Sequence, residues 1–354
     1  MKHRTSKTKF SKLMPRRFTL ALAMAVLFQA AITGAATAAD TSVRVVATIK
    51  PLHSLVSAVM AGLGEPHLIM RGAVTPHTFS LRPSDAAVLA NAQVVFLIGE
   101  SLETSLTGPI DTLAGSAQVV ALSEARDLVQ RPLRVGARFE AHGHGIEGEH
   151  GHHEEDPEEH SEKEEVSHGE DDHDSHGQAV FDMHIWLDPV NAGVMARTIA
   201  ATLSRVDPDN AAGYMANAEA LLQRLDTLGA QISREVAPIR GKPFIVFHDA
   251  YRHFEDRFGL TAVGSAVVSA DRPPGARRIM ELRTKVRELG VTCVLTEPQF
   301  EPRLVNVIIE GTPARAGTVD PLGADIISGP ELYFSLLRNM AASFRDCLAP
   351  VAEK

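Results

Sequence analysis

The stretch DPDNAAGYMANAEALLQRLDTLGAQISREVAP, residues 207–238, decides the fold. Its apolar residues recur at spacings of four and three, which places them in one stripe along a single helix; they are Tyr214, Ala218, Leu221, Leu225, Leu228, Ile232 and Val236. Asp207-Pro208 is typical of a helix start, and Pro238 ends the helix. The pattern predicts a rigid linking helix over residues 207–237, about 29 residues and roughly 44 Å long.

Strand patterns and helix patterns alternate on both sides of this helix. The apolar runs VVFLIG at 94–99 and FIVF at 244–247 are typical of buried parallel strands, and the alternation predicts α/β units. The expected fold class is therefore α/β, with two Rossmann-like lobes of mainly parallel sheets joined by the long helix. We place the N-terminal lobe at residues 40–206 and the C-terminal lobe at residues 238–354.

The amino terminus predicts export. Residues 1–39 contain seven Lys and Arg side chains and no acid, with an apolar run at 20–28 and small residues at the end. This order is typical of a cleavable signal peptide, cut here after Ala38 or Ala39, so we expect a periplasmic protein. The apolar run is too short for a membrane span, and no later stretch of the sequence reaches the required length.

The segment from Ala141 to Gly177 is dominated by histidine and acidic residues. It holds fourteen acids, one lysine and nine histidines, which are His142, His144, His150, His152, His153, His160, His168, His173 and His176. Because apolar side chains are almost absent, we predict a disordered loop that offers many weak, auxiliary sites to a divalent cation. A pH-sensitive acidic linker is the alternative interpretation.

The charge of the chain is concentrated in that segment. The formal charge of −9 becomes −16 once residues 1–39 and their seven cations are removed, and the His- and acid-rich segment holds −13 of it. The rest of the mature chain is nearly neutral, so no basic surface for nucleic acid or anionic lipid is visible. We expect neither as a partner.

Cys293 and Cys347 are the only cysteines, and both lie in the last quarter of the chain. An even number of cysteines in an exported chain predicts a disulfide. Such a bridge would stabilise the fold by about 4 kcal/mol on the chain-entropy model. Two buried free thiols are the less favoured alternative, and the C-x-x-C spacing of a cysteine metal site is absent.

Three histidines fall where open α/β sheets bind ligands, beyond the carboxyl ends of strands. His248 ends the run FIVF, His77 lies in the loop before a helix that starts near Ser84, and His184 lies four residues before the expected helix cap at Asp188. Three neutral imidazoles suit Zn²⁺, with copper, nickel and cobalt as competitors, whereas manganese would require more carboxylate oxygens. We therefore predict a zinc site in the cleft between the lobes.

The fourth ligand of this site is either water or an acid. Asp320, in TVDPLG, is the candidate acid, and capping of the DPLG turn is its alternative role. Glu297 is a second choice. His53, in the first turn of a helix, is a weaker candidate for the site, and His67 is expected to be structural.

At these residues the sequence resembles the ZnuA-type, zinc-binding periplasmic components of bacterial ABC importers, a branch of the solute-binding proteins that also serve manganese. The matching stretches are HTFSLRPSD from His77, MHIWLDP around His184, FHDAY around His248, EPQF from Glu297 and DPLG from Asp320. They span residues 41–348 in the same order as in that family. The resemblance implies two α/β lobes joined by one long helix, a His- and acid-rich loop before the second metal histidine, and a disulfide in the second lobe.

The resemblance also implies metal ligands at His77, His184 and His248. Some members of the family have an acid directly before the first metal histidine, whereas this chain has Pro76, whose side chain has no ligand atom. The fourth position therefore stays open between water and Asp320. Manganese-binding relatives are similar at Asp320 but replace one metal histidine with an acid, so the three histidines favour zinc.

The expected function is capture of Zn²⁺ and its delivery to an ABC-transporter permease with its ATPase, by a monomer that is not an enzyme. A zinc-dependent hydrolase is one alternative, because three histidines and a water also describe a catalytic site. Asp249 is the nearest candidate base for it, although we expect this residue to cap a helix. A metal-storage or adhesion protein without a transporter is another alternative, and manganese is the alternative metal.

Overall fold

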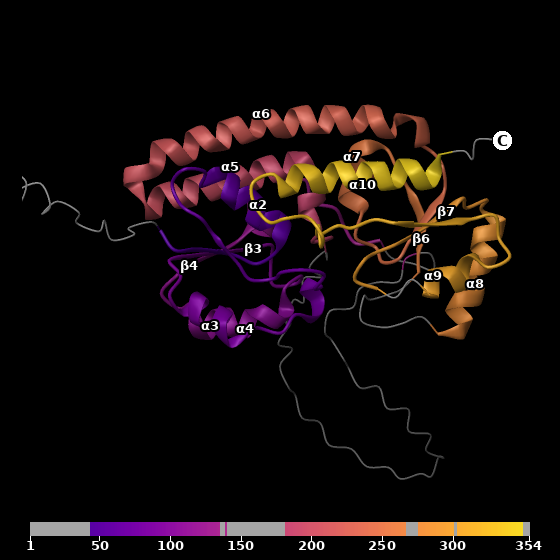
Figure 1. Ribbon diagram of the computed structural model, residues 1–354, viewed down its shortest axis with the longest axis horizontal. Helices are drawn as coiled ribbons and strands as arrows, with labels where there is room; N and C mark the ends of the chain where they lie inside the picture. The colour runs from indigo at the N-terminus through magenta and orange to yellow at the C-terminus, as the bar shows by residue number, and fades with distance from the viewer. Residues whose placement is uncertain (1–42, 135–138, 140–180, 267–274, 301–302, 350–354) are drawn as a thin grey trace, which may run out of the picture. The chain divides into compact units, whose positions relative to one another are not determined.

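The computed structural model describes residues 43–134, 139, 181–266, 275–300 and 303–349 (Figure 1). The predicted signal peptide and the predicted His- and acid-rich loop, with its nine auxiliary histidines, lie outside these residues. Within the described ranges, no helix has the length and apolar character needed to cross a membrane.

Two four-stranded, fully parallel sheets confirm the predicted α/β class. The first has the strand order β2-β1-β3-β4 and the second β6-β5-β7-β8, so both lobes repeat one topology. In each sheet the order reverses next to the first strand, between β1 and β3 or between β5 and β7. The strands are β1 (Val45–Ala47), β2 (His67–Leu68), β3 (Val94–Leu97), β4 (Gln118–Ala121), β5 (Phe244–Val246), β6 (Ala262–Ser265), β7 (Cys293–Thr296) and β8 (Arg315–Thr318).

Helices connect the parallel strands, as crossover connections require. They are α2 (Lys50–Val59), α3 (Pro83–Ala90), α4 (Thr104–Leu113), α5 (Pro189–Val206), α6 (Ala211–Val236), α7 (Arg252–Phe258), α8 (Ala276–Glu288), α9 (Arg303–Ile309) and α10 (Leu332–Leu348). Local chemistry sets their ends. The Asp188 side chain caps α5 by accepting a hydrogen bond from the Val190 N–H at 2.9 Å, and Gly259 ends α7 with φ of 72°, which side chains other than glycine rarely adopt.

The long helix α6 has 26 residues, about 39 Å at 1.5 Å per residue. It is shorter than the expected 29 residues because residues 208–210 and 237–239 form 3₁₀ turns at its two ends. The seven apolar residues that define its predicted stripe are the seven that the structure buries. Helices α5 and α10 pack alongside it (Figure 1).

The second sheet divides its side chains between two cores. Phe244 and Val246 of β5 join the large core that includes α6, α10 and the first sheet. Ile245, between them, joins a smaller core with Leu282 of α8 and Val305 of α9. This alternation follows from the two-residue period of a strand, which sends neighbouring side chains to opposite faces.

Direct hydrogen bonds connect the lobes at the segment after β8. The buried Lys50 ammonium, at the start of α2, donates to the carbonyls of Gly323, Ala324 (2.8 Å) and Ile326 (2.6 Å). The Trp186 indole N–H donates to the Pro321 carbonyl at 2.9 Å. Burial lowers the pKa of Lys50, and these carbonyls compensate the desolvated ammonium.

A disulfide joins Cys293, at the start of β7, to Cys347, near the end of α10, with the two Cα atoms 5.7 Å apart. Gly317 of β8 leaves room for this bridge, since a Cβ added there would lie 2.7 Å from the Cys347 sulfur. The bond closes a loop with a sequence separation of 54 residues.

Replacing both cysteines with alanine is expected to lower the free energy of unfolding by about 4 kcal/mol, because the unfolded chain regains the entropy of this loop. For a chain of this size the midpoint of thermal unfolding should fall by roughly 6 °C. Calorimetry of the metal-free protein measures this change. The unsubstituted protein under reductant is the control and should unfold at the same lowered temperature; a change below about 2 °C would contradict the prediction.

Candidate metal centre

The three predicted histidines come from separate elements. His248 lies two residues after β5, and His184 lies five residues before the start of α5. His77 lies in a 3₁₀ turn, Pro76–Thr78, in which the Thr75 hydroxyl accepts a hydrogen bond from the His77 N–H at 3.3 Å. Each imidazole therefore stands on a short loop at the end of regular structure, where side chains can point out of the sheet.

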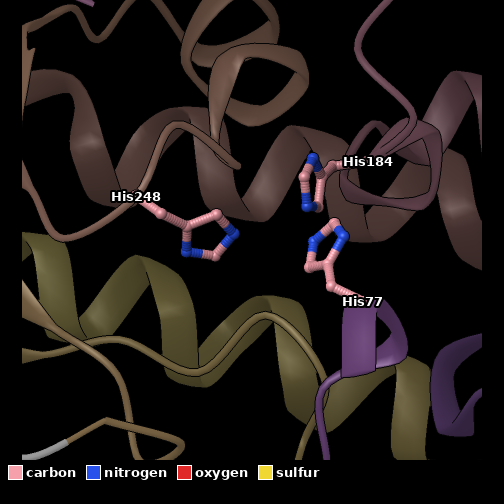
Figure 2. Close-up of side chains that lie close together, drawn as sticks. All are labelled: His77, His184 and His248. Atoms are coloured by element: carbon pink, nitrogen blue, oxygen red, sulfur yellow. The ribbon is translucent and has the colours of Figure 1, made fainter. Parts of the chain in front are cut away.

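These imidazoles meet in space although they are far apart in sequence. One ring nitrogen from each histidine can be chosen so that all three lie within 4.8 Å of one another. The ring centroids of His77 and His184 are 6.0 Å apart, those of His77 and His248 are 6.2 Å apart, and those of His184 and His248 are 5.4 Å apart. Figure 2 shows the three rings pointing toward a common space. The fold therefore brings the three predicted histidines together.

Two of the histidines are backed by buried carboxylates. The Nδ1 atom of His184 lies 2.7 Å from Asp182 Oδ1, and the Nδ1 atom of His248 lies 2.5 Å from Glu297 Oε1. Each contact orients its ring through Nδ1, as the carboxylate does in a carboxylate–histidine–metal relay. Burial alone would raise the pKa of Asp182, but the His184 imidazole outweighs it and holds this pKa below its usual range.

Glu297 and His248 occupy the switch point of the second sheet. His248 follows β5 and Glu297 follows β7, and the strand order reverses between these two strands. Open α/β sheets bind ligands at this kind of position. Burial tends to lower the pKa of His248, but the Glu297 carboxylate outweighs it, so the pKa of His248 is raised overall.

The pocket around the imidazoles is small and mostly apolar. Beside the histidines it is lined by Trp186, Phe300, Pro321 and Leu322. His184 and His248 are only 7% and 4% exposed. A cation that entered would therefore lose most of its water, and ring nitrogens are the groups placed to replace it.

Asp320 is not part of the group of ligand atoms. Its carboxylate accepts backbone hydrogen bonds from Leu322 and Gly323 at 2.9 Å and from Ala324 at 2.6 Å. This is the turn-capping role that the sequence left open for Asp320. His53 lies elsewhere, in a second pocket lined also by residues 61, 62, 64–66 and 328–330.

The expectation that Asp249 caps α7 is wrong. The N-cap of α7 is Tyr251, and the Asp249 carboxylate binds the Arg134 guanidinium, with Nε at 2.9 Å from Oδ2. Sequence reasoning also missed Asp182 as a partner of His184. Its position two residues before the histidine was the available signal.

Comparison with known proteins identifies the family. The family model of ZnuA, the periplasmic zinc-uptake complex component A, matches residues 45–347. The high-affinity zinc uptake system protein ZnuA of Brucella suis is 53% identical over 305 residues, which cover 86% of this chain and 91% of the relative. The protein of the same name from Yersinia pestis is 33% identical over 307 residues, covering 87% of this chain and 92% of the relative.

Solved structures share the fold. A crystal structure of ZnuA matches with a TM-score of 0.68 at 23% identity and covers 87% of this chain and 100% of that chain. The periplasmic zinc-binding protein TroA of Treponema pallidum matches with a TM-score of 0.67 at 20% identity, over 87% of this chain and 100% of that chain.

The family match, the fold and the clustered imidazoles together define a solute-binding protein of the two-lobed α/β type, a class that binds and delivers a solute. Within that class, the chain belongs to the ZnuA family of periplasmic zinc-uptake components. Zinc is therefore its transported solute, and the hydrolase alternative is wrong.

Proposed function

We propose that this protein binds one Zn²⁺ through ring nitrogens of His77, His184 and His248, with water as the fourth ligand. The observation that carries this proposal is the meeting of three imidazoles within 4.8 Å. Nitrogen donors at Zn–N distances of about 2.0–2.1 Å around a tetrahedral ion lie roughly 3.4 Å apart, so zinc binding would draw the ring nitrogens together by at most about 1.4 Å.

The donor set favours zinc over manganese. Among the residues that the structure describes, the group of ligand atoms contains three imidazole nitrogens and no carboxylate oxygen, whereas manganese prefers oxygen ligands. Asp182 and Glu297 act on the site through the histidines, because each bonds an Nδ1 atom. Their negative charges compensate the cation and increase the basicity of the ligands.

We also propose a transport partner and a periplasmic location for the protein. Within its zinc-uptake system, it delivers zinc to an ABC-type permease with an ATPase, and it does so as a monomer. Residues 1–39 direct export and are then removed. Residues 141–177, with nine histidines and fourteen acids, supply auxiliary weak sites that raise the zinc concentration near the tight site.

Deleting residues 141–177 should leave one tightly bound zinc while lowering the total number of zinc ions bound, because the three proposed protein ligands lie outside this segment. Native mass spectrometry counts bound metal, and competition with a chelator measures affinity. Manganese added in excess is the control for metal type and should not displace the tight zinc. Loss of the tight zinc together with the segment would contradict the proposed site.

A further inference from the structure

Two described segments flank the His- and acid-rich stretch and lie against each other. We call them the stem; they are residues 131–134 and 181–182. Pro132 and Phe181 form an isolated antiparallel bridge, and the Asp182 N–H donates to the Arg131 carbonyl at 2.8 Å. The stem leads directly into His184.

The stem is fastened to α7, the helix that follows His248. The Arg252 guanidinium donates to the Pro132 carbonyl. The His253 Nε2 atom lies 3.0 Å from the Asp182 carbonyl oxygen. The stem is therefore held by the second lobe although its residues precede the long helix in the chain.

Arg134 adds charged contacts between the stem and the second lobe. Its guanidinium lies between two acids, with Nε at 2.9 Å from Asp249 Oδ2 and Nη1 at 2.8 Å from Glu255 Oε2. The three side chains are 15%, 5% and 1% exposed for Arg134, Asp249 and Glu255. The Phe139 ring lies against the same guanidinium, 4.1 Å from Cζ to the ring centroid. Planar, two-sided pairing of this kind fixes geometry more firmly than a single ammonium contact does.

These contacts give two histidines of the metal centre one common support. Asp182, in the stem, holds the His184 ring through Nδ1 at 2.7 Å. Arg134, also in the stem, holds Asp249, which directly follows His248 in the chain. Glu297 holds the His248 ring at its Nδ1 atom, and the Arg134–Asp249 pair anchors the next residue of the chain.

We propose that Arg134 is a positioning residue for zinc: through Asp249 it fixes the backbone at His248 and so couples the stem to the metal centre. This inference rests on the proposed role of His248 as a zinc ligand. Loss of a group that orients a metal ligand typically costs 10–100-fold in metal affinity. Substitution of Arg134 should therefore weaken zinc binding, although its side chain offers no ligand atom.

The test compares zinc affinities of full-length variants, measured by chelator competition with less than one equivalent of zinc. Arg134→Gln should weaken zinc binding 10–100-fold, and Arg134→Lys should restore part of the affinity because it keeps a cation. Asp249→Asn should weaken binding similarly. The double variant Arg134→Gln, Asp249→Asn should lose less binding free energy for zinc than the two single variants lose together. The reason is that both substitutions break the same contact.

A matched control distinguishes an effect on the position of His248 from a general loss of protein stability. Arg240 donates from Nε to the Phe258 carbonyl, at 2.9 Å, at the other end of α7. Arg240→Gln should leave zinc affinity within twofold of the parent, whatever it does to thermal stability. The visible spectrum of one equivalent of Co²⁺ supplies a second readout, because it should change in the Arg134 and Asp249 variants and not in the Arg240 variant.

The outcomes distinguish the two proposals. If His248→Ala abolishes tight zinc binding while Arg134→Gln and Asp249→Asn keep affinity within twofold, the inference about Arg134 is wrong and the proposed zinc site stands. If His248→Ala itself leaves affinity unchanged, both are wrong. Should Arg134→Gln fail to fold, Arg134→Lys and the nearly isosteric Asp249→Asn decide the question in the same way.

Discussion

Replacing His248 with alanine is expected to weaken tight zinc binding by at least about 100-fold. This loss exceeds the 10–100-fold loss of affinity that follows removal of a side chain that only orients a metal ligand. The substitution removes one of three nitrogen ligands and leaves Glu297 buried without its imidazole. Alanine at His77 or His184 should have an effect of the same order, because each contributes one nitrogen to the same group. Chelator competition measures the affinity, and native mass spectrometry of the protein without residues 141–177 counts the remaining metal.

His67→Ala is the matched control for these substitutions. His67 is a half-buried imidazole that also lies beside a carboxylate, with Nε2 at 3.2 Å from Asp85 Oδ1, but it lies outside the group of ligand atoms. Zinc at 100 times its dissociation constant should stabilise the parent and the His67 variant by about 2.7 kcal/mol. The three ligand variants should show little of this stabilisation. An unchanged metal count in all three would rule out the proposed site.

Periodic patterns made most of the fold predictable, and two elements show where such patterns fail. Helix α4 contains Pro109 in its interior, which normally argues against a helix. It forms because Leu106 and Ile110 pack into the core. Strand β6 has the sequence AVGS, too short and too small to signal a strand, and it forms because β5 pairs with it. In both cases tertiary contacts outweigh local preference.

The site was predictable only in part. The proposed ligands lie beyond the ends of strands, where a sequence can be searched for them, but the side chains that hydrogen-bond to these ligands follow no such rule. His248 was found as a residue beyond a strand end. Its partner Glu297 lies 49 positions later and becomes adjacent because β5 and β7 pair. Asp249 was expected to obey a local capping rule, and Arg134, 115 positions earlier, binds it instead. Such long-range ion pairs leave no periodic trace in a single sequence.

Acidification is expected to reduce zinc affinity steeply, and the reduction should begin above pH 6.5, the usual pKa of histidine. Zinc and a proton compete for the same ring nitrogen. Burial opposes protonation of His248, but Glu297 outweighs it and raises the pKa of His248, so the proton competes at higher pH than usual. Below this range the dissociation constant should rise about tenfold per pH unit for each imidazole that must lose a proton. Chelator competition from pH 8 to pH 5.5 measures the profile.

The variant Glu297→Gln separates the charge effect from ligand loss. Without the carboxylate, the pKa of His248 falls, so the onset of affinity loss should move to lower pH. Affinity at neutral pH should nevertheless drop 10–100-fold, because the ligand loses its anionic partner. Glu288→Gln, at the exposed end of α8, is the control and should leave both properties unchanged. An identical pH profile in the Glu297 variant would contradict the assigned cause.

The same raised pKa has the opposite consequence for the metal-free protein. A histidine whose pKa is higher in the folded than in the unfolded state stabilises the fold fully below the unfolded pKa, near 6.5, and this contribution is lost as pH rises through the folded pKa. His248 therefore favours the empty fold in acid, where zinc affinity is lowest. Thermal unfolding of the metal-free parent and of Glu297→Gln, at pH 6 and at pH 8, should show a larger gain on acidification in the parent, because the variant lacks the charge that raises this pKa.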